Sequence, residues 1–97
     1  MGNGLREKHI EQALVKEVKK RNGVAYKFVS PGCAGVPDRL VLFPHRRMAF
    51  IELKASGQRL RPLQKKRKRQ LESLGFLVFC LDDIGQIGGV LDGIQAT

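Results

Sequence analysis

Two short apolar segments near the middle of the chain constrain its fold more than any other feature. Residues 39–43 read RLVLF and residues 48–54 read MAFIELK, with only residues 44–47 between them. Both are rich in β-forming side chains, and so tight a connection joins antiparallel neighbours, so we predict a β-hairpin. Strands this apolar are usually covered on both faces, which predicts helices above and below the sheet.

The segment before the hairpin predicts a helix and a further strand. Ile10, Leu14 and Val18 recur at the four-residue spacing of one helix face, within a predicted helix over residues 6–21. The helix is expected to stop at the Asn-Gly pair that follows. Residues 24–29, VAYKFV, are a predicted strand, and the Gly- and Pro-rich stretch after them is a predicted loop.

The segment after the hairpin predicts a helix, a strand and a short final helix. Pro62 suits the first turn of a helix over residues 62–74, and Gly75 ends it. Residues 76–81, FLVFCL, are the fourth predicted strand, reached through a helical crossover. We therefore predict one α/β domain over residues 1–97, with a central mixed β-sheet flanked by helices in the order α-β-β-β-α-β-α.

The charge balance points to a polyanionic partner. Eighteen Lys and Arg face nine Asp and Glu, for a net charge of +9. Neutralising phosphates releases condensed counterions, so nucleic acid is the leading partner. A membrane surface is disfavoured because the chain has no Trp and no apolar run near the ~20 residues of a span. We expect a cytoplasmic protein that binds neither a membrane nor a small-molecule cofactor.

The two cysteines do not predict a zinc site. Cys33 and Cys80 lie far apart in the sequence, and neither they nor His9 and His45 show paired ligand spacing. We interpret Cys80 as a small core residue in a strand and Cys33 as a loop residue.

Three polar residues around the hairpin predict chemistry. Asp38 enters the first hairpin strand, and Glu52 and Lys54 stand near the end of the second. Side chains alternate across a strand, so Glu52 and Lys54 share a face, and the pairing can bring Asp38 close. Converging carboxylates repel unless a cation lies between them, which suits Mg²⁺. The alternative is an ordinary solvated strand face.

The same residues resemble a known nuclease signature. Pro37-Asp38 and Glu52-Leu53-Lys54 look like the PD-(D/E)xK motif, and the wider strings GVPDRLVLF, MAFIELKASGQRLRPLQ and GFLVFCLDD resemble the small stand-alone members of the VRR-NUC family. The resemblance implies a restriction-endonuclease-like core and a metal-dependent DNA endonuclease. It implies Mg²⁺ or Mn²⁺ at Asp38 and Glu52, with the Leu53 carbonyl as a further ligand and Lys54 as a catalytic residue.

The resemblance also implies two further site residues. Glu11 matches the acid that the family carries on its first helix, as catalytic residue and metal ligand, and Gln64 matches a glutamine that opens the next helix. Glu7 points to the same side of the first helix, so the choice between Glu7 and Glu11 stays open, with Glu11 favoured. Glu11 could instead pair with a lysine of its own helix, and Gln64 could be a solvated helix residue.

A run of cations predicts the DNA-binding surface. Adjacent like charges without an acid between them favour phosphate contact over a merely solvated face. Arg46 and Arg47 at the hairpin tip, and Ser30 in the preceding loop, are weaker candidates that also fit ordinary turns. The loop and helix candidates are Arg59, Arg61, Lys65, Lys66 and Lys68.

We also predict a homodimer that cuts branched DNA such as four-way junctions. The apolar final segment would gain stability from a partner, and stand-alone VRR-NUC proteins resemble two-fold symmetric junction-resolving nucleases. Alternatively, this segment packs on its own sheet. The rival function is a non-catalytic nucleic-acid-binding module, with RNA as a competing ligand.

Overall fold

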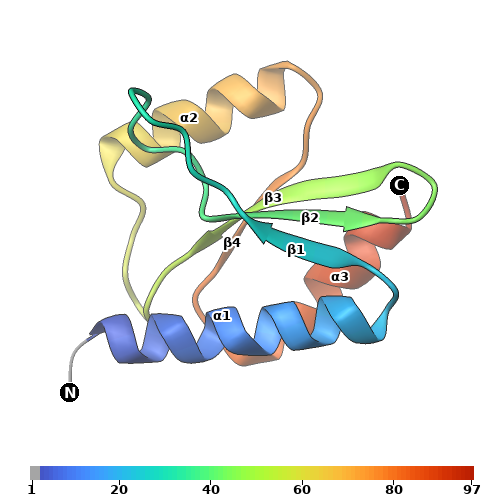
Figure 1. Cartoon of the computed structure of the whole chain (residues 1–97). Helices are drawn as coiled ribbons and strands as arrows, with labels where there is room; N and C mark the ends of the chain where they lie inside the picture. Colours follow the sequence, from blue (N-terminus) through green and yellow to red (C-terminus); the bar gives the residue numbers. More distant parts are fainter. Residues whose placement is uncertain (1–2) are drawn as a thin grey trace.

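A computed structural model describes residues 3–97 of the chain, with side chains from residue 6 onward, as one four-stranded sheet between helices (Figure 1). The predicted α/β class and mixed sheet are confirmed. The sheet order is β1-β2-β3-β4, with β3 and β4 parallel and the other neighbours antiparallel. The elements are α1 (Asn3–Lys20), β1 (Val24–Lys27), β2 (Arg39–Phe43), β3 (Arg47–Leu53), α2 (Pro62–Ser73), β4 (Val78–Leu81), a 3-10 turn η1 (Ile84–Gln86) and α3 (Ile87–Gln95).

The two outer strands are shorter than predicted because their neighbours limit the pairing. In β1, the strand pairing ends where Lys27 lies opposite Arg39, the first residue of β2, and one more hydrogen bond follows, from the Phe28 N–H to the Asp38 carbonyl at 2.8 Å. In β4, the pairing with β3 begins at Val78 opposite Phe50. The apolar residues just outside these limits therefore belong to loops, although their composition is typical of strands.

Helices α1 and α3 cover one face of the sheet (Figure 1). The predicted stripe of α1 is buried, with Leu14 and Val18 fully inaccessible. The helix ends where predicted, because Asn22 takes a positive φ of 64° and the Gly23 N–H bonds the Val18 carbonyl at 2.9 Å. Within the described residues, no helix is long and apolar enough to cross a bilayer.

The final helix is covered by its own sheet. Ile87, Leu91 and Ile94 are buried in the same apolar cluster as the α1 stripe. The expectation that α3 needs a partner subunit is therefore wrong as a reason for a dimer, because the sheet already removes these side chains from water. Arg21 also ties the end of α1 to α3 by donating to Asp92 at 2.8 Å.

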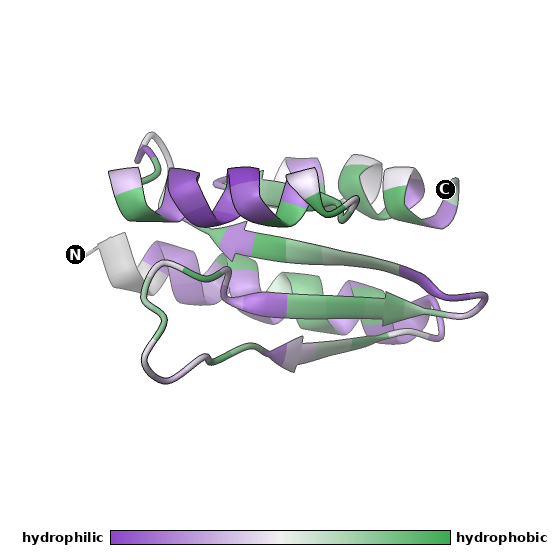
Figure 2. Ribbon diagram, turned by 90° about the horizontal axis from the view of Figure 1, so that it is seen from above, coloured by the Kyte–Doolittle hydropathy of each residue, from purple (hydrophilic) through white to green (hydrophobic). Residues whose placement is uncertain are grey.

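Helix α2 alone covers the other face, and it has no buried residue. Figure 2 colours it mostly purple, in contrast to the green strands. Its attachment runs through the loop before β2: the Arg67 guanidinium donates to the Ala34 carbonyl at 2.9 Å. Gly35, at a φ of +87°, packs so closely that a Cβ there would lie 2.8 Å from Leu63.

Candidate active site

The hairpin register brings two carboxyl groups together at one end of the sheet. The Asp38 N–H donates to the Ile51 carbonyl at 3.0 Å, which continues the ladder one residue before β2. The Asp38 Oδ2 accepts from the Leu53 N–H at 2.8 Å. This places the Asp38 carboxyl within hydrogen-bonding reach of the Glu52 carboxyl, whose side chain is only 4% exposed.

The electrostatics of this pair favour a positive charge between the two groups. Burial, followed by the hydrogen bond with Asp38 and its charge, raises the pKa of Glu52 from 4.5 to about 9, and Lys54 opposes part of the rise. A proton therefore occupies the pair at neutral pH. The same oxygens are the donors that Mg²⁺ and Mn²⁺ prefer, so the pair fits a divalent ion that would replace this proton.

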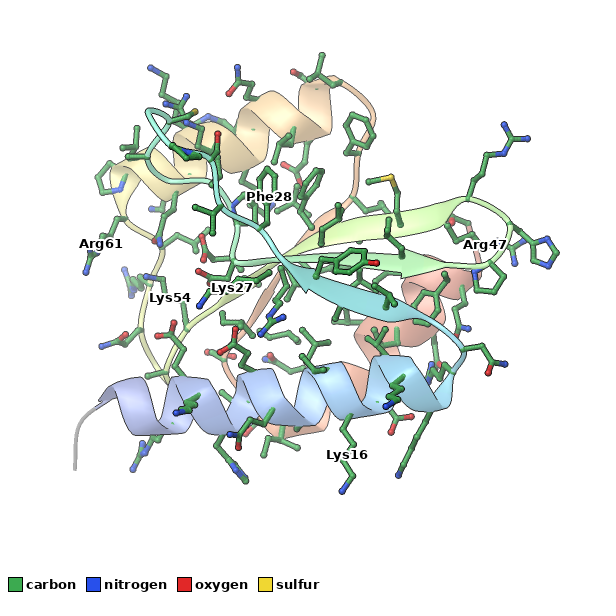
Figure 3. All side chains as sticks on the ribbon, in the orientation of Figure 1. Lys16, Lys27, Phe28, Arg47, Lys54 and Arg61 are labelled. Atoms are coloured by element: carbon green, nitrogen blue, oxygen red, sulfur yellow. The ribbon has the colours of Figure 1, made fainter. Side chains whose placement is uncertain are left out.

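Lys54 is positioned as predicted, on the same face as Glu52 and one residue past the end of β3. It is buried to 8% exposure, and its backbone N–H donates to the Leu81 carbonyl at 2.9 Å, which fixes the chain at this point. Figure 3 shows Lys54 at the end of the sheet, between the layer of α1 and the layer of α2.

The two acids of α1, Glu7 and Glu11, occupy different environments. The Arg39 Nε donates to a carboxylate oxygen of Glu11 at 2.9 Å and forms an ion pair with it. Glu11 is therefore paired with Arg39 of β2, and not with a lysine of its own helix or with a residue of the proposed metal site. Glu7, one turn earlier, is the acid near the pair. Burial first, then the charge of Asp38, raises its pKa, and it contributes in turn to the shift at Glu52.

Gln64 lies at the start of α2 as predicted, but its side chain is engaged. Its Oε1 accepts from the Arg61 N–H at 2.8 Å, which caps the first turn of the helix. Its amide NH₂ group is left to contact a ligand. The structure thus gives Gln64 a structural role that the sequence pattern did not indicate.

The cations of the α2 region differ in whether an acid within the chain pairs with them. Lys65 and Lys66 are exposed, whereas the Lys68 Nζ pairs with Glu72 at 2.8 Å. No acid lies between these cations, as the sequence shows, but Glu72, one helical turn further on, pairs with Lys68. Arg59 and Arg61, in the segment that follows Lys54, are both exposed, and Figure 3 shows Arg61 at the same end of the sheet as Lys54.

The hairpin-tip arginines lie far from the carboxyl pair. Arg47 opens β3 and Lys54 follows its end, a separation of roughly 23 Å along an extended strand. Figure 3 shows the two residues at opposite ends of the sheet. The Arg47 Nε also donates to the Thr97 carbonyl at 3.0 Å. Arg46 and Arg47 therefore cannot touch the same phosphate as Lys54.

Two residues near the site were missed or only weakly indicated by the sequence. Lys27, at the end of β1 and opposite Arg39, lies at the same end of the sheet as Asp38. Its position as the single cation of an apolar strand was the available signal. Ser30 is half-buried in the loop before Asp38, where its carbonyl accepts from the Cys33 N–H at 3.0 Å.

Comparison with known proteins identifies the family. A protein named "Putative nuclease p44", from Acyrthosiphon pisum secondary endosymbiont phage 1, is 50% identical to this chain over 78 residues, 80% of this chain and 84% of that protein. This chain belongs to that nuclease family. A solved structure named "VRR_NUC domain" matches the nuclease with a TM-score of 0.84 at 22% identity, covering 90% of this chain and 95% of that one. No family model matches the sequence.

These matches confirm the predicted VRR-NUC resemblance and the fold of the nuclease. Within residues 3–97, no three His, Cys, Asp or Glu side chains converge as a ready-made metal cage. Any ion at the Asp38–Glu52 pair of the nuclease would complete its shell with other oxygens, such as backbone carbonyls and waters.

Proposed function

We propose that this nuclease hydrolyses phosphodiester bonds of DNA and uses Mg²⁺ or Mn²⁺ held by Asp38 and Glu52. One observation carries the proposal: the Glu52 carboxyl is 4% exposed and within hydrogen-bonding reach of the Asp38 carboxyl, beside buried Lys54. Burying two acids together lowers stability unless a cation or a proton lies between them. A module that only binds DNA gains nothing from such a pair next to a phosphate.

A third oxygen lies on the same side. The Leu53 N–H points at Asp38, and in an extended strand the N–H and C=O of one residue point to the same side. The Leu53 carbonyl is therefore a further ligand in this proposal. When bound, the divalent ion would polarise a phosphoryl oxygen and lower the pKa of a bound water.

The protein side chains supply the rest of the chemistry. Lys54 is buried, so the charge of its ammonium group would stabilise negative charge on the phosphate more strongly than it would in water. Glu7 replaces Glu11 as the proposed acid of α1, because Glu11 is committed to Arg39. The free NH₂ group of Gln64 would contact a phosphate or a water near the start of α2.

The central test compares cleavage of labelled DNA by the wild type and by Asp38→Asn, Glu52→Gln and Lys54→Met in Mg²⁺, Mn²⁺ or EDTA. Each variant is expected to lose about a hundredfold or more of the rate while DNA binding persists. Asp92→Asn is the matched control, since it neutralises an exposed acid and keeps an acceptor for Arg21. Full activity of Glu52→Gln, or full activity in EDTA, would defeat the mechanism and favour the binding module.

A paired experiment separates the two acids of α1. Glu7→Gln is expected to lower the cleavage rate with little loss of thermal stability. Glu11→Gln is expected to lower stability, because the partly buried Arg39 keeps an acceptor but loses the negative charge opposite it, and to act on the rate only through folding. The reverse pattern would show that Glu11, and not Glu7, is the acid of α1 that takes part in cleavage.

We further propose that the enzyme acts as a homodimer on branched DNA such as four-way junctions. The support is its small size and its resemblance to stand-alone VRR-NUC proteins, since two identical sites suit the two equivalent strands of a junction. Light scattering at micromolar concentration measures the assembly, and parallel cleavage of a junction and a linear duplex measures selectivity. A monomer that cuts both substrates equally fast contradicts this proposal.

A further inference from the structure

A cleft of about 540 Å³ opens between α1, the loop after β3 and the turn after β4, and the proposed chemistry does not use its lining. Three segments that are far apart in the sequence form the cleft: the start of α1, the loop after β3 and the turn after β4. Figure 1 shows these segments at the same end of the sheet. Ser56 lies two residues beyond Lys54, and Asp82 follows Leu81, whose carbonyl accepts from the Lys54 N–H. These links place the cleft at the same end of the sheet as Lys54.

The charged groups of the cleft are of both signs. Arg6 and His9 line it from α1, and Asp82 and Asp83 line it from the turn after β4. Each acid has one oxygen engaged within the chain: Asp82 Oδ1 accepts from Gln86 at 2.7 Å, and Asp83 Oδ2 accepts from the Gly85 N–H at 2.9 Å. The second oxygen of each carboxylate is left to accept a hydrogen bond from a ligand.

This composition excludes simpler ligands. A free anion would meet two carboxylates, and a bare divalent cation would meet the Arg6 guanidinium. Within the described residues, no three metal-ligating side chains converge here or elsewhere. The occupant must therefore carry an anionic group and hydrogen-bond donors on the same molecule.

The remaining walls of the cleft are apolar. Ile84 is 41% exposed, although it is a large aliphatic residue, and Ile10 lies beneath the same opening. The volume falls in the usual range of about 300–1,000 Å³ for small-molecule sites. A flat, apolar ring with a polar edge would cover Ile84 and reach the acids, which is the shape of a nucleobase.

We propose that this cleft binds one unpaired nucleotide of the substrate, with its phosphate at Arg6 and His9 and an amino-bearing base edge at Asp82 and Asp83. Acidic side chains accept hydrogen bonds from the exocyclic amino group of cytosine in the same way. This inference deepens the proposed function and rests on it, because the cleft adds a substrate subsite at the same end of the sheet as Lys54. It gives the enzyme a means to recognise a base that has left the duplex.

Binding of free mononucleotides tests the subsite without any cleavage. Amide NMR spectra of the full chain, without metal, are recorded with dCMP, with dTMP and with inorganic phosphate. We expect dCMP to shift the amides of Ser56 and Ile84, and dTMP, which lacks the exocyclic amino group, to bind about tenfold more weakly. Absence of dCMP shifts, equal binding of dTMP, or the same shifts with phosphate alone would each overturn the proposal.

Two variants sharpen the result. Ser56→Phe fills the cleft from an exposed position and is expected to abolish the dCMP shifts, whereas Ser73→Phe, an exposed serine at the end of α2, is its control. Asp82→Asn keeps an oxygen for Gln86 but introduces a donor, so it is expected to remove the preference for dCMP over dTMP. Wild-type dCMP binding by Ser56→Phe overturns the site, whatever the outcome of the cleavage assays.

Discussion

On the face of the sheet covered by α1 and α3, twelve buried side chains form one continuous apolar cluster, whereas the helix over the opposite face has no buried residue. That opposite face also has apolar contacts. The centroid of the Phe50 ring lies 5.4 Å from that of Phe28 and 5.9 Å from that of Phe76. The same face carries the buried charges, Glu52 and Lys54.

This difference separates stability from chemistry. Apolar burial is the main source of folding free energy, and most of it lies on the α1–α3 face. The α1–α3 face can therefore stabilise the fold, while the other face contains a carboxyl pair that lowers the stability of the fold. The following experiments test this division, in order of decreasing expected effect.

The largest effect is expected from a core truncation on the α1–α3 face. Leu91→Ala removes a fully buried side chain of α3 and should cost about 2–5 kcal/mol. Leu74→Ala, which truncates a leucine that is 68% exposed beside α2, should cost only about 0.5 kcal/mol or less. Urea unfolding measures both, and similar costs would mean that the two faces contribute equally.

The next effect concerns the attachment of α2. Gly35→Ala and Gly32→Ala both place a side chain at a positive φ, near +87° and +80°, which costs about 1–2 kcal/mol. Only at Gly35 does the new Cβ meet Leu63, at 2.8 Å. Gly35→Ala should therefore destabilise by a further 1 kcal/mol or so and also lower DNA cleavage. Equal behaviour of the two variants would mean that this packing does not hold α2 in place.

A smaller effect, of about 1.4 kcal/mol for each pH unit, is expected from pH. The pKa of Glu52 is higher in the folded protein, about 9, than its ordinary value of 4.5, so the folded state keeps a proton that the unfolded state loses. In the absence of metal, stability from this group is greatest below about pH 4.5 and falls as the pH rises toward 9.

The same pair gives a direct measurement. Glu52→Gln should flatten the decrease of melting temperature between acidic and alkaline pH, and Asp92→Asn should leave it unchanged. Because metal binding displaces the proton, Mg²⁺ should raise the melting temperature of the wild type more at about pH 8 than at about pH 6. A melting temperature of Glu52→Gln that falls with pH as steeply as the wild type would exclude a protonated pair.

The smallest effect separates the cations of α2. Loss of Lys65 or Lys66 should reduce the slope of log K against log salt by about 0.9 each on duplex DNA, if each exposed ammonium contacts one phosphate as the sequence predicts. Lys68→Ala should change the slope less, because Glu72 already neutralises Lys68. Equal slopes for all three variants would show that the ion pair opens on DNA.

Local features of the sequence were sufficient to predict most of the framework. The bounds of β2, the start of α2 at Pro62 and its end before Gly75 follow from propensity and backbone geometry, which depend on neighbouring residues only. The approach of Asp38 to Glu52 followed from strand alternation and a short hairpin. These features needed no knowledge of distant packing.

The acids of α1 could not be assigned in that way. Glu7 and Glu11 are one turn apart on the same side of the helix, and the choice depends on how far α1 slides along the sheet. The proposed choice of Glu7 rests on the ion pair between Glu11 and Arg39, and a long-range ion pair leaves no periodic signal in the sequence. The distance of the hairpin-tip arginines from the site, by contrast, follows from the predicted hairpin itself, because its turn lies at the opposite end of the two strands from Asp38 and Glu52.

Asp38 and Arg39 are chain neighbours whose side chains serve opposite layers, the first bonded to β3 at the carboxyl pair and the second to Glu11 of α1. A slip of one residue in a strand exchanges its two faces. An insertion of one residue between Pro37 and Val41 is therefore expected to exchange the roles of these neighbours, whereas an insertion of two preserves the alternation. Among natural homologues, length variation in this segment should occur in even steps, and an active homologue with a single-residue insertion there would contradict this constraint.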